Sequence, residues 1–319
     1  MTSRRAAIGM CFSRSYPAGL VTEFAKRLDA GGADQLWVIE DCFYTAGVSL
    51  AAAALAVTER ITVGVGILPA VARNPAITAM EIATLCGIGP GRVLPGIGHG
   101  VQEWMGQMGV RPASPLTALE EVIDAVRRLL AGEEVSVDGR YVRLDRVKLD
   151  QPPVTAPPVI AGVRGPKSLA LAGRVAGGVV LAEPASPAHV TRALDQAGRP
   201  DGFEVAAFAA LCVLPERAGA YREMTPWLAG QLDEPTTEVR ALPFFDELAA
   251  WYAERGADGL AGMPAEWWRA IGPIGTMDDA LAHIAALEEA GATSIGLWSA
   301  PSPEAALAGI DTVAALAKR

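Results

Sequence analysis

The chain has 319 residues, is 51% hydrophobic and carries a formal net charge of −9 at pH 7. That length fits one large α/β domain with a sizeable core, since barrels of this class often form a single unit. The acidic balance without a cluster of Lys and Arg excludes a nucleic-acid surface, and the lack of about 18 consecutive uncharged apolar residues argues against a membrane span.

Strands and helices alternate along the whole chain, with short turns between them. The first helix over VTEFAKRLDAGG ends at glycines, one helix covers 49–57 and another 117–130, the last preceded by a capping Ser114-Pro115. Asp138-Gly139 lies between two alternating stretches and predicts a hairpin. The eight predicted strands are apolar and lie at 6–12, 34–41, 61–67, 92–98, 157–163, 178–183, 203–214 and 292–298.

Eight apolar strands with helical crossovers predict a parallel sheet that is buried on both faces, and this number indicates a (β/α)8 TIM barrel. An open doubly wound sheet is the alternative. We expect residues 1–319 to form a single domain, with an excursion at about 222–272 between the seventh and eighth strands. Four tryptophans crowd this excursion, namely Trp227, Trp251, Trp267 and Trp268.

Four scattered cysteines without a CxxC pair are typical of a reduced, cytoplasmic protein. The N-terminal apolar stretch is broken by Ser13 and Arg14, which argues against a signal peptide. His189 and His283 fall inside predicted helices and are expected at the surface. The strand ends hold no cluster of His, Cys and carboxylate, so we expect no metal. A site with so few acid–base groups suits an organic cofactor.

The third predicted strand contains two glycines, Gly64 and Gly66, and continues through a loop to Pro75 at the first turn of a helix. Interior glycines weaken a strand and mark a bulge or a close backbone approach. Because active sites of these barrels lie at the carboxyl ends of the strands, we expect this strand to approach a ligand there.

The fifth βα turn, GVRGPKSLALAG, has glycines at the start of a helix, where free amides and the helix dipole can hold a phosphate. A plain turn with proline at its first helical position explains the same residues. The predicted contacts are Val163, Arg164, Gly165, Pro166 and Lys167, with Ser168 able to add a side-chain contact.

Five segments in register carry a resemblance to a known family. They are LWVIED, TERITVGVGILPAVARNPAITAMEIATL, GRVLPGIGHG, PPVIAGVRGPKSLALAGRVAGGVVL and IGTMDDALAHIAALEEAGATSIGLW. Together they resemble the luciferase-like monooxygenase superfamily, and its deazaflavin branch more than bacterial luciferase. The resemblance implies coenzyme F-420, with FMN as the alternative cofactor, and a homodimer. It also implies a non-proline cis peptide at Gly66-Ile67, behind the central ring of the cofactor.

The resemblance assigns roles only where positions match. The acidic-then-histidine pair of the family falls on Glu40 and Asp41, so an aspartate replaces the histidine. Asp41 could contact the cofactor or substrate, cap the next helix, or pair with an arginine such as Arg73. His99, within GIGHG, is the second candidate catalytic residue, or else a hydrogen-bonded loop histidine. Where sugar-phosphate dehydrogenases carry an acid, this chain has Val101, which leaves the proton donor undefined.

These observations predict an oxidoreductase that transfers a hydride between F-420 and a small organic substrate. One alternative is a two-component monooxygenase that takes reduced FMN from a separate flavin reductase. Another is a non-catalytic flavin-binding barrel. The residues expected at the cofactor are Asp41, Gly66, Ile67, Gly98, His99, Val163, Arg164, Gly165, Pro166, Lys167, Ala182 and Glu183.

Overall fold

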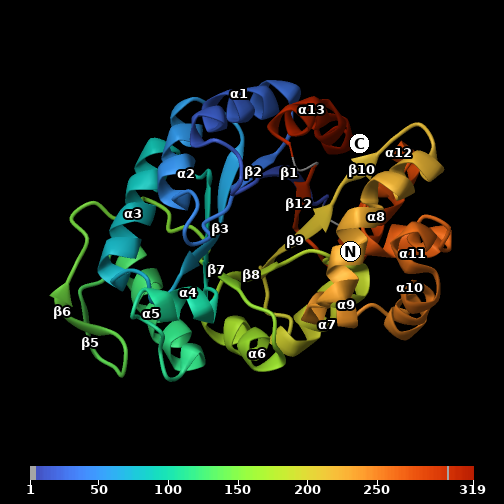
Figure 1. The fold of residues 1–319 in the computed structure, drawn as a ribbon. Helices are drawn as coiled ribbons and strands as arrows, with labels where there is room; N and C mark the ends of the chain where they lie inside the picture. Colours follow the sequence, from blue (N-terminus) through green and yellow to red (C-terminus); the bar gives the residue numbers. More distant parts are fainter. Residues whose placement is uncertain (1–4, 300–301) are drawn as a thin grey trace.

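A computed structural model describes residues 5–299 and 302–319 of the protein. The centre of the molecule is a closed barrel of eight parallel strands (Figure 1). The barrel follows chain order, and the last strand pairs with the first. This arrangement confirms the (β/α)8 prediction and excludes the open sheet. The strands are β1 (Ala7–Phe12), β2 (Gln35–Val38), β3 (Thr62–Pro69), β4 (Val93–Gly98), β7 (Ile160–Gly162), β8 (Gly178–Leu181), β9 (Glu204–Ala210) and β12 (Ser294–Trp298).

Eight helices surround the barrel, one after each strand in the sequence (Figure 1). Capping side chains set the first turns of five of them. Asn74 accepts a hydrogen bond from the amide of Ala76, with Pro75 at the first turn, and Ser114 does the same for Thr117. The helices are α1 (Val21–Gly31), α2 (Gly47–Ala56), α3 (Pro75–Ile88), α5 (Pro115–Leu130), α6 (Pro166–Val175), α7 (Pro187–Ala197), α12 (Met277–Ala290) and α13 (Pro303–Ala317).

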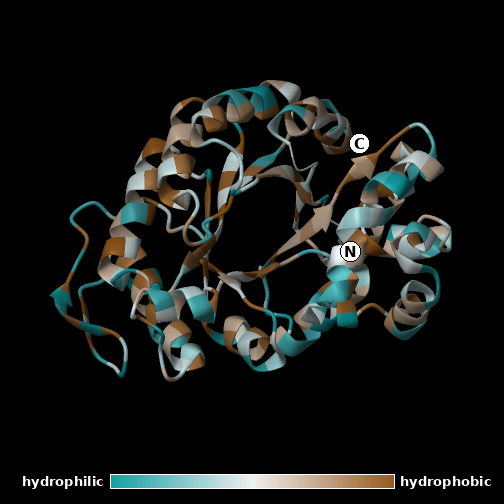
Figure 2. Ribbon diagram, in the orientation of Figure 1, coloured by the Kyte–Doolittle hydropathy of each residue, from teal (hydrophilic) through white to brown (hydrophobic). Residues whose placement is uncertain are grey.

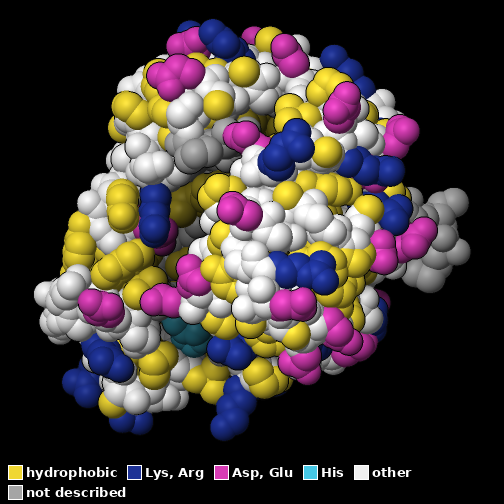
Figure 3. Space-filling view, turned by 45° about the vertical axis from the view of Figure 1, so that its right-hand side comes forward, with side chains coloured by type: hydrophobic (Ala, Val, Ile, Leu, Met, Phe, Trp, Pro, Cys, Tyr) yellow, Lys and Arg dark blue, Asp and Glu magenta, His cyan; other side chains and the backbone are white. Residues whose placement is uncertain are grey.

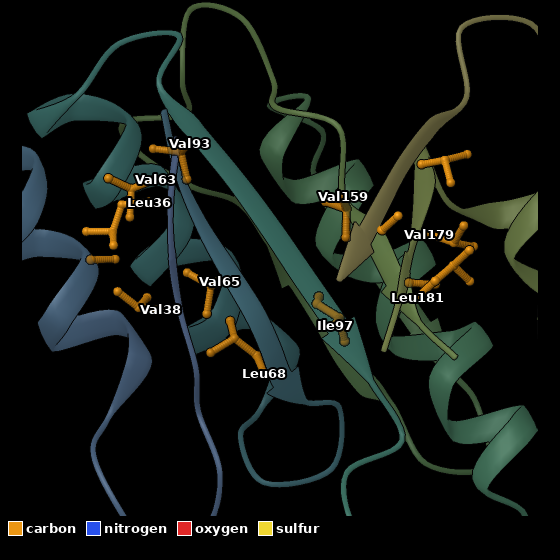
Figure 4. Close-up of a cluster of buried hydrophobic side chains, with 14 of the residues drawn as sticks. Leu36, Val38, Val63, Val65, Leu68, Val93, Ile97, Val159, Val179 and Leu181 are labelled. Carbon is orange, nitrogen blue, oxygen red and sulfur yellow. The ribbon is translucent and has the colours of Figure 1, made fainter. Parts of the chain in front are cut away.

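The main hydrophobic core lies between the strands and these helices. Side chains of alternate strand residues point outward into it, among them Leu36, Val38, Val63 and Val65 (Figure 4). Because strand side chains alternate, the residues between them face the barrel interior. The apolar runs recognised in the sequence are therefore strands that are buried on both faces.

A second, smaller core fills the barrel interior. It is built around Trp37 and Phe208, whose rings meet edge to face with centroids 5.1 Å apart. The indole N–H of Trp37 donates a hydrogen bond to the side-chain oxygen of Gln35 at 3.0 Å. Gly64 lies against this tryptophan, and a Cβ there would come within 2.3 Å of the indole. The glycine at 64 therefore makes room for packing inside the barrel, and the expectation that it faces a ligand is wrong.

Two shorter elements follow β4. A six-residue helix, α4 (Gln102–Gln107), borders the mouth of the barrel, and an antiparallel hairpin joins β5 (Val135–Asp138) to β6 (Arg143–Val147). The hairpin at Asp138-Gly139 is confirmed. Its loop spans 139–142, and the Glu121 carboxylate accepts hydrogen bonds from three of the loop amides. The short 3-10 turn η1 (Ala18–Leu20) precedes α1.

The chain leaves the barrel after β9 and returns before α12. The predicted strand at 203–214 is divided, because Cys212 and Val213 pair with Ile274 and Gly275 outside the barrel. The helices of this excursion share a core around Trp268, which stacks on Tyr221. That the whole chain is one domain stays a prediction. The excursion contains β10 (Cys212–Val213), α8 (Arg217–Asp233), α9 (Thr237–Arg240), α10 (Phe245–Leu260), α11 (Ala265–Ile271) and β11 (Ile274–Gly275).

The surface carries charges of both signs. On the face in Figure 3, Lys and Arg side chains are interspersed with Asp and Glu. None of the helices in the described ranges is long and apolar enough to cross a membrane. The two histidines expected at the surface, His189 and His283, are only 3% and 2% exposed. That expectation is wrong, because each ring packs on the inner face of its helix.

Candidate active site

A cavity of about 730 Å³ opens at the carboxyl ends of the barrel strands, a size typical of small-molecule sites. Every barrel strand, or the loop that follows it, contributes to its lining. The lining residues are Ser13, Arg14, Ile39, Glu40, Asp41, Gly66, Ile67, Pro69, His99, Gly100, Val101, Trp104, Gly162, Val163, Arg164, Gly165, Ser168, Val180, Ala182, Glu183, Phe208 and Trp298.

Most of the residues predicted from the sequence meet in this cavity. Nine of the twelve line it, and Gly98, Pro166 and Lys167 do not. Pro166 and Lys167 lie in the first turn of α6, directly after the lining residue Gly165. Gly98 is buried beneath the side chain of Ile67. The assignment of these twelve residues to a cofactor stays a prediction.

Ile67 forms part of the cavity floor because β3 is irregular at that point. The register of β3 against β4 shifts between Val65 and Leu68, and the peptide bond Gly66-Ile67 is cis, which confirms that prediction. The Ile67 side chain leans over the neighbouring strands. Added Cβ atoms at Gly98 and Gly162 would lie 3.0 Å and 2.5 Å from it. Close packing around Ile67 thus helps to explain the glycines at 98 and 162.

Each of the two acidic residues after β2 has its own arginine. Glu40 is buried and receives Arg73 on both carboxylate oxygens, at 2.5 Å and 2.9 Å, together with the amide of Gly47 at 2.9 Å. Asp41 pairs instead with Arg14, Nη1 to Oδ2 at 2.6 Å. Glu40 is therefore a structural anchor of this loop, whereas Asp41 faces the cavity.

Arg14 is a lining residue that the sequence reasoning missed. It comes from the loop after β1, and its guanidinium lies over the ring of Tyr44 at 4.6 Å and near Trp104 at 6.0 Å. It thus links three loops around the mouth. The Arg14–Asp41 pair presents a cation in the cavity lining. In the sequence, an arginine just after the first strand is a weak indication of a cavity residue. Only its ion pair with Asp41 distinguishes it from other arginines.

His99 contacts the start of α6. Its Nε2 lies 2.9 Å from the hydroxyl of Ser168. Burial lowers the pKa of His99 below its usual value, partly opposed by a backbone hydrogen bond at Pro115. The ring is therefore neutral near pH 7 and can position Ser168 or accept a hydrogen bond. This geometry fits the interpretation as a hydrogen-bonded loop histidine at least as well as a catalytic one.

The turn before α6 leaves open space above it. Gly165 is the N-cap residue, and a Cβ at this position would meet no atom within 4 Å. The first amides of this ten-residue helix face the region next to the cavity lining. Free amides at a helix N-terminus are suited to bind an anion. This turn is therefore a candidate phosphate-binding position.

Next to this turn, Arg164 reaches a residue of the excursion, and Glu183 lies at the end of the neighbouring strand β8. Arg164 Nη1 lies 3.3 Å from Oε2 of Glu238, a residue of α9 with no exposed surface. Burial, above all, raises the pKa of Glu183. Within the described parts of the chain, no group of three or more His, Cys, Asp and Glu side chains could hold a metal ion.

Known proteins resemble the chain in sequence and fold. The luciferase-like monooxygenase family model matches residues 13–294. The 5,10-methylenetetrahydromethanopterin reductase of Methanolobus tindarius is 34% identical over 62% of this chain and 56% of its own length. The enzyme of that name from Archaeoglobus fulgidus is 26% identical over 88% and 90%. The match to the first relative thus spans little more than half of it.

The fold agrees with these relatives. The structure of the coenzyme F-420-dependent tetrahydromethanopterin reductase from Methanopyrus kandleri superposes with a TM-score of 0.78 at 21% identity, over 97% of this chain and 98% of that one. The family model covers most of the chain, and the barrel and its cavity agree with it. The chain therefore belongs to the luciferase-like monooxygenase family.

Proposed function

We propose that the protein is an oxidoreductase that binds coenzyme F-420 in this cavity and transfers a hydride between it and a small organic substrate. The observation that carries the proposal is the placement of the Ile67 bulge and the open N-terminus of α6 around a single cavity. A planar ring fits against the bulge, and a phosphate fits at the helix. The relatives named as reductases support the same activity.

The residues present fit such a cofactor. The backbone amides from Val163 to Lys167 would hold its phosphate, and Asp41 with Arg14 would contact its polar edge. When bound, the deazaflavin supplies hydride chemistry, because carbon replaces the ring nitrogen that activates oxygen in FMN. The chain itself excludes water and orients the ring against an apolar floor.

The alternative is an FMN-dependent monooxygenase that is served by a separate flavin reductase, which the family name supports. Fluorescence quenching with F-420 and with FMN separates the two. Tighter binding of F-420 supports the hydride-transfer proposal. Binding of FMN alone would replace it with the monooxygenase, and binding of neither would point to a non-catalytic barrel.

Replacement of Gly165 by Leu is expected to weaken F-420 binding by about 1–3 kcal/mol, because the side chain would cover the amides that hold the phosphate. The space around Gly165 means that the protein itself can accept the larger residue. Gly230→Leu is the matched control, since Gly230 is exposed in α8 and also has no neighbour within 4 Å of a Cβ. Unchanged affinity in the Gly165 variant would sink the phosphate assignment.

Asp41→Ala is expected to lower the affinity for F-420 about tenfold or more, and to lower turnover, with little loss of stability. Both members of the Arg14–Asp41 pair are partly exposed, so its contribution to folding is at most about 1 kcal/mol. Asp195→Ala serves as the control, because Asp195 on α7 also forms a partly exposed ion pair, with Arg199. Parallel losses of melting temperature and cofactor affinity would indicate a structural role for Asp41.

We propose that the protein is a homodimer that packs through α3. Three apolar side chains of this helix, Ile77, Met80 and Ile88, are 45%, 50% and 41% exposed. Hydrophobic residues are frequent along α2 and α3, whereas the outer side of α1 is mainly hydrophilic (Figure 2). Such an apolar surface favours association. We also place the protein in the cytoplasm, in line with its free cysteines.

Met80→Glu is therefore expected to convert the dimer to a monomer in light-scattering measurements, because a buried unpaired charge is costly. Val154→Glu, which changes a fully exposed apolar residue away from α3, should leave the dimer intact. A dimer that survives Met80→Glu and Ile77→Glu would place the interface elsewhere.

A further inference from the structure

Glu183 stands out among the ionisable groups of the cavity. It follows β8 at the carboxyl end of the barrel and lines the cavity together with Phe208 and Trp298. Within the parts of the chain that the structure describes, no Lys, Arg or His lies within 4 Å of its carboxylate. It is a half-buried carboxyl group in the cavity lining.

The other acids and bases of the lining are engaged. Glu40 is held by Arg73, and Asp41 is held by Arg14. His99 contacts Ser168 and is kept neutral by burial, which lowers its pKa. Among the acidic residues of the lining, Glu183 is therefore the one without an ion-pair partner in the described ranges.

The surroundings of Glu183 favour its neutral form. Burial is the largest cause of its raised pKa, and the negative charges of Glu238 and Asp41 act in the same direction. Its own backbone amide and Arg164 oppose the shift. Arg164, however, is shared with Glu238 at 3.3 Å, which reduces what it offers Glu183. Cys11 of β1 also faces this carboxyl group, and burial keeps that thiol protonated by raising its pKa.

We propose that Glu183 is the catalytic acid–base residue that exchanges a proton with the substrate, which gives this cavity the proton donor that its sequence left undefined. The inference rests on the proposed hydride transfer. In reduction of a C=O or C=N group, the hydride from the reduced cofactor forms a C–H bond and the π electrons move to the heteroatom. That atom takes the proton as the Glu183 O–H bond breaks, and the resulting carboxylate regains a proton from water. Oxidation runs the same steps in reverse.

The first test is a titration of the ligand-free protein that is labelled with ¹³C at the glutamate side-chain carboxyl carbon. The Glu183→Gln variant identifies the resonance, and Glu103→Gln, on the exposed side of α4, is the control. We expect a midpoint above the ordinary glutamate value of about 4.3. A midpoint at or below that value would overturn the proposal.

The second test uses thermal stability, which also needs no ligand. A raised folded-state pKa means that the folded protein holds a proton that the unfolded chain has released, so stability falls as pH rises through this window. Glu183→Gln removes that loss. Its melting temperature relative to the wild type should therefore increase between pH 4 and pH 8, while Glu103→Gln shows no trend. A flat difference for Glu183→Gln would contradict a proton-carrying residue.

The third measurement separates this inference from the proposed function. F-420 quenching should give dissociation constants for the wild type and Glu183→Gln that agree within about threefold, because we now assign Glu183 to the substrate in place of the expected cofactor contact. A large loss of affinity would make Glu183 a cofactor ligand and overturn the acid–base role. Failure of the wild type to bind F-420 would refute the proposed function, whereas the titration of Glu183 would still be measured.

Discussion

Acidification from pH 7 to pH 4 is expected to remove about 3 kcal/mol of stability for each of two buried histidines. His189 on α7 and His283 on α12 are almost fully buried. Burial, above all, lowers the pKa of each to about 4. Nearby charges act on His189 in opposite directions. Glu238 favours its protonated form, whereas Arg192 and Arg164 oppose it.

The direction follows from the two states of each ring. The folded-state pKa lies below the unfolded value of about 6.5, so the unfolded chain binds more protons between pH 6.5 and 4. Stability is complete above about pH 6.5 and is lost as pH falls. His283 places Nδ1 2.5 Å from the carbonyl oxygen of Arg269, while its Nε2 has no partner among the described residues. Protonation would leave that second N–H buried without an acceptor.

Urea unfolding at pH 7, 5.5 and 4 measures the effect. His189→Gln and His283→Gln are each expected to lower the free energy of unfolding at pH 7. Each variant should also remove about half of the acid-induced loss of stability that the two histidines cause together. Asp279 is paired with Arg217, which holds its pKa at about 2, so its stabilising contribution is lost only below this range. A pH dependence that is unchanged in both variants would show that folding does not lower the pKa of these histidines.

The eight strands could be predicted because they are short apolar runs that end at glycine, proline or polar residues. Their ends were less predictable. The strand at 203–214 stops at Ala210 because Cys212 and Val213 find partners in β11, more than sixty residues later in the chain. Likewise, a helical position gave no sign that His189 and His283 face inward. Periodicity shows that an element exists, but distant partners decide its ends and its inner face.

The location of the candidate site could be predicted from the sequence, whereas the interactions between its residues could not. The rule that strand carboxyl ends form the active site brought together nine residues that line one cavity. The ion pairs could not be foreseen, because Arg14 and Arg73 each have several acidic residues within reach of a flexible loop. The structure joins Arg73 to Glu40 and Arg14 to Asp41. Only after this pairing does Glu183 emerge as a carboxyl group without an ion-pair partner among the described residues.

The two glycines of β3 have different surroundings, although they look alike in the sequence motif. Gly66 lines the cavity and lies against Phe208, while Gly64 contacts only the interior of the barrel. Both are small because a large aromatic ring occupies the same layer. The sequence contains this information in Trp37 and Phe208, but their position inside the barrel depends on closure of the sheet.

Gly64→Ala is expected to destabilise the fold by about 3 kcal/mol or more, as overpacking of a filled core does. The new methyl group would lie 2.3 Å from the Trp37 ring, which is fully buried and hydrogen-bonded to Gln35. Because β3 pairs with strands on both sides, it cannot move away. Urea unfolding gives the change in free energy.

Two further glycines calibrate this result. Gly66→Ala should cost only about 1 kcal/mol, because its methyl group meets the movable edge of the Phe208 ring at 3.2 Å. Gly87→Ala, in open space on α3, should gain up to about 1 kcal/mol from helix propensity. If the clash with Trp37 is the cause, Gly64→Ala must cost less in a Trp37→Leu background than in the wild type. Equal costs in the two backgrounds would mean that strand propensity, and not packing within the barrel, requires glycine at this position.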